Sequence, residues 1–164
     1  MRWRRQAVPD QVTGLELDRG ERRVSWALTT DGQSVVVTDR GLRLPEPGLL
    51  TWDQIERVGF DGAARTVREL AEVEATGPSH TVTLDLSGQT DLPEVLRARV
   101  TASVAWSSHE RLQPIGGVRI VGRRKPDQDA LVWQLVFDQG TDLADPRVRE
   151  QADAHLHAAR RTID

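Results

Sequence analysis

The chain has 164 residues and a formal net charge of −3, with 38% hydrophobic and 29% charged residues. These values are typical of a globular protein that is long enough to bury a core. The negative balance argues against a dedicated nucleic-acid binder, and the absence of cysteine excludes disulfides, thiol catalysis and thiolate metal sites.

Residues 1–19 are predicted to form an arm, because they show no hydrophobic periodicity. Arg2, Arg4 and Arg5 form a basic cluster in it, and two interpretations stay open: a partly ordered arm, or an electrostatic contact with a membrane or an acidic partner. No apolar stretch follows the cluster as in a signal peptide, and no run approaches the roughly 20 residues of a membrane helix. We therefore expect a cytoplasmic protein.

A β-hairpin is predicted next. Apolar and polar residues alternate over residues 22–29, and a second strand follows at residues 34–38. The dipeptide Asp31-Gly32 between them favours a two-residue type I′ turn, in which both residues take positive φ.

The antiparallel sheet is expected to continue beyond this hairpin. A short strand is predicted at residues 42–44, and residues 49–60 form the next one, with a bend or bulge at Asp53-Gln54. Residues 63–74 fit a helical face and also a strand. We predict a strand there, because it keeps the sheet continuous, and the helix stays open as the alternative.

A strand at residues 80–86 precedes the clearest helix signal of the chain. Asp91 is a good N-cap, and Glu94 stands three residues later, as in a capping box. A new strand is expected to begin near Val104. The predicted apolar stripe of the helix consists of Leu92, Leu96, Val100 and Val104.

The C-terminal part is predicted to be a second hairpin and a second helix. Residues 118–123 and 131–137 alternate in hydrophobicity as paired strands do. Asp145-Pro146 combines an N-cap with a proline in the first helical position, so a helix is expected to about residue 161. Its apolar stripe would be Val148, Ala152, Leu156 and Ala159.

This order of elements predicts an α+β fold. We expect an antiparallel β-sandwich or partly open barrel that is capped by a helix and followed by a β-hairpin and a C-terminal helix. The expected parts are an arm at residues 1–19, a main domain at residues 20–105, and a segment at residues 106–164 that packs on the same core.

The stretches SVVVTDRGLRL and WDQIERV carry a family resemblance. Residues 38–42, read TDRGL, and residues 52–55, read WDQI, make the region of about residues 20–104 resemble the bacterial pleckstrin-homology-like and GRAM-type domains. The resemblance implies two packed sheets capped by a helix, an adaptor role in binding lipid or protein, and no catalytic residues. Lipid-binding members place Lys and Arg around the first hairpin loop, whereas residues 29–32 are acidic here. The whole chain also resembles small proteins of actinobacterial type.

The densest basic run lies on the second predicted hairpin and consists of Arg119, Arg123, Arg124 and Lys125. Two interpretations stay open for this run. It forms a solvated hairpin face, or it is a docking patch for an acidic partner or anionic headgroups.

The histidines and the C-terminal carboxylates predict no metal site. His155 and His157 point about 200° apart on a helix, since neighbours on one face are three or four residues apart. His80 and His109 stand alone in the sequence. The three carboxylates around Gly140 miss the spacing of a calcium-binding loop, and turns and helix capping explain them: Asp138, Asp142 and Asp145.

The sequence therefore predicts a non-enzymatic interaction domain with an unidentified protein partner, bound at an exposed sheet edge or in a groove beside the helix at Asp91. The alternative is peripheral binding to an anionic membrane surface through residues 2–5 and 119–125. A third possibility is an enzyme with an unrecognised site. We predict no catalytic residue, no cofactor, no metal and no nucleic-acid partner.

Overall fold

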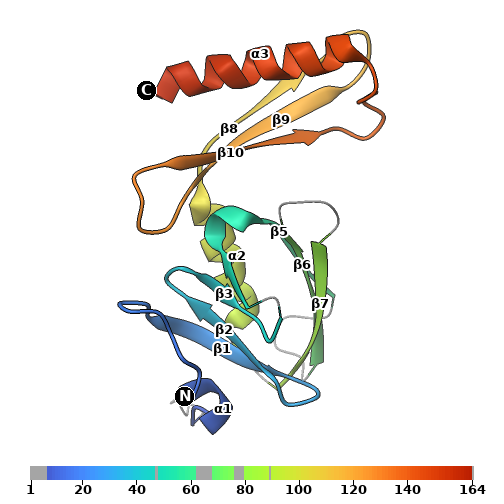
Figure 1. The fold of residues 1–164 in the computed structure, drawn as a ribbon. Helices are drawn as coiled ribbons and strands as arrows, with labels where there is room; N and C mark the ends of the chain where they lie inside the picture. The colour runs from blue at the N-terminus through green and yellow to red at the C-terminus, as the bar shows by residue number, and fades with distance from the viewer. Residues whose placement is uncertain (1–6, 47, 62–67, 76–79, 89, 164) are drawn as a thin grey trace, which may run out of the picture. The chain divides into compact units, whose positions relative to one another are not determined.

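The computed structural model describes residues 7–46, 48–61, 68–75, 80–88 and 90–163. The chain forms two compact units, residues 1–101 and residues 102–164. The fold is α+β, as the sequence predicted: a curled antiparallel sheet in the form of a half-barrel, a helix, an antiparallel sheet of three strands and a C-terminal helix (Figure 1).

The described helices and strands are α1 (Asp10–Thr13), β1 (Arg23–Thr29), β2 (Ser34–Thr38), β3 (Gly41–Arg43), β4 (Leu49–Thr51), the 3₁₀ helix η1 (Trp52–Gln54), β5 (Ile55–Asp61), β6 (Arg68–Ala75), β7 (His80–Ser87), α2 (Leu92–Ser103), β8 (Val104–Arg111), β9 (Gly117–Arg124), β10 (Leu131–Phe137) and α3 (Pro146–Ile163).

In the sheet of the first unit, β1 and β7 pair only over a short length. Its described strands follow the order β4-β3-β2-β1-β7-β6-β5, and β1 meets β7 only at Leu28↔Ser87 and Thr29↔Leu86. Where the two strands diverge, the Thr90 hydroxyl donates to the Trp26 carbonyl oxygen at 2.7 Å. The segment that leads into α2 thus satisfies a backbone carbonyl of β1 beyond the point where β7 pairs with that strand.

Helix α2 fills the space inside the curled sheet. Leu92 and Leu96 are fully buried, Val100 is 9% exposed, and all three belong to the same hydrophobic cluster as Val37 and Ile55 of the strands. The predicted stripe is therefore confirmed at these three positions, while Val104 begins β8.

The first hairpin is confirmed, but its predicted type I′ turn is wrong. Among the described non-glycine residues only Asp127 has a positive φ, so Asp31 does not, while Gly32 has φ +85°. The Gly32 amide donates to the Thr29 carbonyl at 2.9 Å, and the Thr29 amide donates to the Gln33 carbonyl at 2.8 Å. The loop is a three-residue one with glycine in the left-handed region. The Thr29 hydroxyl donates to the Asp31 carboxylate and stabilises this alternative.

Two further predictions concern the middle of the sheet. The ambiguous stretch at residues 63–74 is a strand from residue 68 onward, and its first part lies outside the described residues. The predicted break at Asp53-Gln54 is the helix η1, whose capping box joins Thr51 and Gln54.

The second unit is a sheet in the order β10-β9-β8, with α3 packed on one face (Figure 1). The Asp145 carboxylate caps α3 by accepting from the Arg147 amide at 2.9 Å. The predicted stripe of α3 is confirmed: Val148, Ala152 and Ala159 are buried, and Leu156 packs against them.

Each unit has a buried hydrophobic cluster, and the two clusters share no residue. The packing of residues 106–164 on the core of residues 20–105 stays a prediction. None of the described helices combines the length and the apolar character that a membrane span requires.

Candidate functional site

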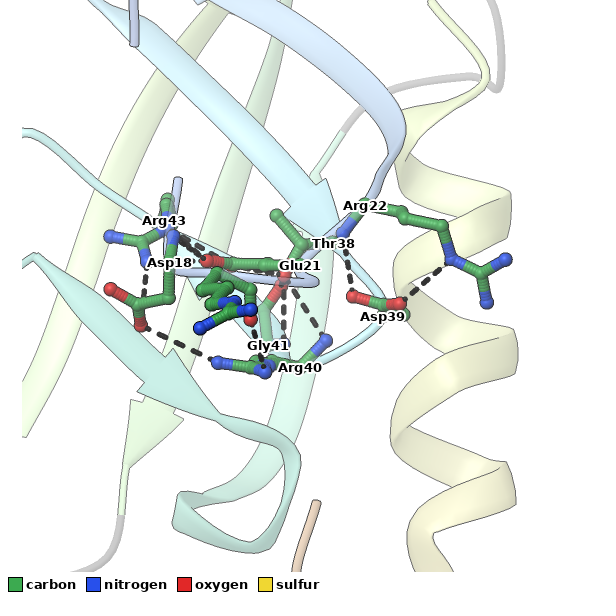
Figure 2. Close-up of polar contacts among 9 residues, drawn as sticks. Asp18, Glu21, Arg22, Thr38, Asp39, Arg40, Gly41 and Arg43 are labelled. Carbon is green, nitrogen blue, oxygen red and sulfur yellow. Dashed lines mark hydrogen bonds and ion pairs between the residues drawn. The ribbon is translucent and has the colours of Figure 1, made fainter. Parts of the chain in front are cut away.

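A densely connected polar cluster lies where the segment before β1 crosses the corner between β2 and β3 (Figure 2). The Glu21 side chain is fully buried, and Arg43 Nε lies 3.0 Å and 3.1 Å from its two carboxylate oxygens. The Thr38 hydroxyl donates to the same carboxylate at 2.6 Å, and the Asp18 amide donates to it at 2.9 Å. Asp18 also lies 3.1 Å from Arg43 Nη2.

The electrostatics of this cluster favour the ionised pair. Burial opposes ionisation of Glu21, but the hydrogen bonds from Arg43, Thr38 and the Asp18 amide hold the pKa of Glu21 below its ordinary value. The Glu21 carboxylate in turn raises the pKa of Arg43. Beside it, the Arg22 amide and guanidinium lower the pKa of Asp39.

The charged groups of this cluster bind one another. Both oxygens of the buried carboxylate are occupied by groups of the chain, so no lone pair of Glu21 is aimed at an outside ligand. Its effect is to fix residues 18–22 against the turn between β2 and β3. We therefore assign it a structural role.

The predicted basic patch is divided between the two faces of β9. Arg119 and Arg123 share one face and Arg124 lies on the other, because side chains alternate along a strand. Arg119 is exposed, whereas Arg123 is only 6% exposed and donates to Ser103 Oγ at 2.8 Å and to Gln134 Oε1 at 3.2 Å. Lys125 is exposed at the start of the β9–β10 loop. Arg2, Arg4 and Arg5 lie outside the described residues.

A pocket of about 540 Å³ lies between the β9–β10 hairpin and the last turns of α3. Its apolar lining comes from Leu131 and Trp133 of β10 and from Ile163 of α3. Trp133 is held by an edge-to-face contact with Trp106, with ring centroids 5.7 Å apart. The remaining lining residues are Arg124, Gln128, Asp129, Ala130 and Arg160.

Two guanidinium groups give this pocket its charge. Arg124 is fixed by donating to the Ala102 carbonyl at 3.1 Å, near the C-terminal end of α2. Within the part of the chain that the structure describes, the side chains of Arg160 and Asp129 form no hydrogen bond or ion pair. The pocket thus combines two cations, one carboxylate and an apolar wall, which suits a ligand with an acidic group next to apolar groups.

The register of the second sheet brings together a pair that the sequence did not reveal. His109 Nε2 and Asp138 Oδ2 are 2.7 Å apart, although 29 residues separate them. Gly117 lies between them, and a Cβ there would stand 2.3 Å from the Asp138 carboxylate. The residue that permits this contact is therefore Gly117, which has no side chain to separate the two groups. Its role can be recognised only once the strand register that brings His109, Gly117 and Asp138 together is known.

His155 and His157 differ in their surroundings on α3. His155 is partly buried and lies 3.9 Å from Glu110, while His157 is exposed. Among the described residues, no group of three or more His, Asp or Glu side chains is arranged to hold a metal ion. Asp138 instead contacts His109, and Asp145 caps the start of α3.

Comparison with protein-family models, with curated proteins and with solved structures finds no significant match to this chain. The resemblance to pleckstrin-homology-like domains therefore stays a prediction based on residues 38–42 and 52–55.

Proposed function

We propose that this chain is a non-catalytic, cytoplasmic interaction protein with a pleckstrin-homology-like first unit. It binds a protein partner in the pocket between β10 and α3. The observation that carries the proposal is that Arg124 and Arg160 line one pocket together with Leu131, Trp133 and Ile163. A guanidinium pair binds carboxylates strongly, and an apolar wall beside it accepts the neighbouring side chain of an extended segment.

The geometry favours a protein over an anionic membrane surface. Membrane attachment by charge needs basic side chains that protrude together from one surface. Here the basic run is split between the faces of β9, and Arg123 is buried against Ser103 and Gln134. A concave site of about 540 Å³ admits a chain end or a short segment, and it does not match a flat lipid surface.

The test is selection of a random peptide library, displayed with free C-termini, on the full chain. We expect enriched peptides that place Asp, Glu or the terminal carboxylate next to an apolar residue. Arg160→Gln should weaken their binding by about tenfold, because one charged hydrogen bond is lost. Arg161→Gln is the matched control, since Arg161 belongs to the same helical turn but does not line the pocket.

Equal binding to both variants would show that the pocket is not the site. The absence of any enriched peptide, together with salt-sensitive retention on phosphatidylserine vesicles, would favour the membrane alternative.

A further inference from the structure

The described sheets end in four edge strands, and three of them are protected. Edge strands expose unpaired N–H and C=O groups, and proteins usually blunt them by short length, charges or bulges. Strand β4 has three residues, β5 carries Glu56 and Arg57, and β8 carries Glu110 and Arg111 as well as a register shift. Strand β10 reads LVWQLVF, without charge or proline, and pairs with β9 in an unbroken register.

The register shows which backbone groups of β10 face outward. The Asp138 amide donates to the Gly117 carbonyl at 2.9 Å, and the Lys125 amide donates to the Ala130 carbonyl at 3.1 Å. Hydrogen-bonded pairs recur at every second residue of an antiparallel ladder, so the even-numbered residues of β10 bond to β9. The backbone groups that point away from β9 are those of Leu131, Trp133, Leu135 and Phe137.

The sequence of β10 is nearly self-complementary about Gln134. An antiparallel second copy centred there places Leu131 opposite Phe137, Val132 opposite Val136, and Trp133 opposite Leu135. Each of these pairs joins residues of the same parity, so outward N–H groups meet outward carbonyl groups. All pairs are apolar, and only the neutral Gln134 faces itself. We propose that β10 is the interface of a homodimer, in which two copies of this chain form one continuous sheet about a twofold axis.

Charges at the two ends of β10 complement each other in this arrangement. The same register places Asp138 of the second copy opposite Ala130, and Lys125 lies beside Ala130 on the other side. Lys125 and Asp138 of the second copy are then two strand spacings apart, roughly 10 Å, with only a methyl group between them. Lys125 is exposed, and the Asp138 side chain is 45% exposed; its Oδ2 contacts His109, which leaves Oδ1 for this contact. The twofold axis repeats the pair at the other end.

Sedimentation velocity of the full chain tests the interface. We expect a monomer–dimer equilibrium for the parent chain. Val136→Glu should abolish the dimer, because the twofold axis would bury two carboxylates, each opposite Val132 of the other copy. The variant should still fold, because Arg119 of β9 is paired with position 136 of β10 within the same chain. Its guanidinium would lie beside the new carboxylate. Val136→Thr is the control, because it keeps the branched shape without a charge, and it should dimerise within about threefold of the parent.

A charge exchange tests the register. Lys125→Glu and Asp138→Lys should each raise the dissociation constant by about tenfold, since each places two like-charged contacts in the dimer. The double variant should restore the parent value. A parent chain that stays monomeric, or a dimer that persists in Val136→Glu, would overturn the proposal. Failure of the double variant to restore dimerisation would overturn this twofold register. None of the substituted positions lines the pocket, although Leu131 and Trp133 belong both to β10 and to the pocket lining, so these variants test the dimer without altering the pocket itself.

Discussion

Gly41 lies where β3 passes closest to β4. A Cβ at this position would stand 2.0 Å from the Leu50 carbonyl oxygen, which is backbone and has little freedom to move. We expect Gly41→Ala to lower the free energy of unfolding by about 3 kcal/mol, because β3 and β4 must separate to admit the methyl group. Chemical denaturation measures this difference.

Gly59→Ala is the matched control. Gly59 is also a strand residue, but a Cβ there meets nothing within 4 Å. It should stabilise the fold by about 0.5 kcal/mol, because alanine has less freedom in the unfolded chain. An equal loss of unfolding free energy in Gly41→Ala and Gly59→Ala would mean that the close approach of β3 and β4 does not cause the destabilisation.

Glu21 makes the stability of the first unit depend on pH. Because the pKa of Glu21 is lowered by folding, the unfolded state takes up the proton first as the pH falls. The stabilisation is fully present above the ordinary glutamate pKa of about 4.3 and is lost as the pH falls through the lower folded value.

Glu21→Gln should therefore destabilise the fold by about 2 kcal/mol at neutral pH, since charged hydrogen bonds to Arg43 become neutral ones. The difference from the parent should shrink as the pH falls below about 4, where the parent carboxylate is also protonated. Urea titrations at a series of pH values measure it. A difference that is constant with pH would contradict the ion-pair explanation.

At the scale of the elements, the alternation of apolar residues predicted most of the strands, the continuity of the sheet predicted β6, and the apolar stripes predicted both long helices. The hairpin turn was missed because Asp-Gly is compatible with more than one turn. Here the bond between Thr29 and Asp31, together with Gly32 in the left-handed region, selects the three-residue loop. Such a choice depends on a side chain outside the dipeptide.

The candidate site was less predictable than the fold. The alternation along β9 already separates Arg123 from Arg124, but the burial of Arg123 depends on Ser103 and Gln134, which come from other elements. Glu21 and Arg43 are 22 residues apart, so spacing gives no sign of their contact. The pocket was also missed, because Arg160 and Trp133 meet only through the packing of α3 on the sheet.

At the scale of the whole molecule, two separate hydrophobic clusters predict two local responses to core mutations. Leu96→Ala removes a fully buried side chain of the first cluster and should cost about 3 kcal/mol. Hydrogen exchange should show the larger loss of protection in β1–β3. Val148→Ala creates a cavity in the second cluster, and the larger loss of hydrogen-exchange protection should then appear in β8–β10. Equal losses in all strands for both variants would mean that the chain unfolds as one cooperative unit.

Lys125 is the only lysine of the chain, and it begins the loop beside Arg124. Apart from the terminal amine, an amine-reactive ester therefore has a single point of attachment, next to the pocket. A photoreactive group carried on that ester would form a covalent adduct with a polypeptide lying within its reach. Mass spectrometry of the adduct would then read the sequence of that neighbour directly.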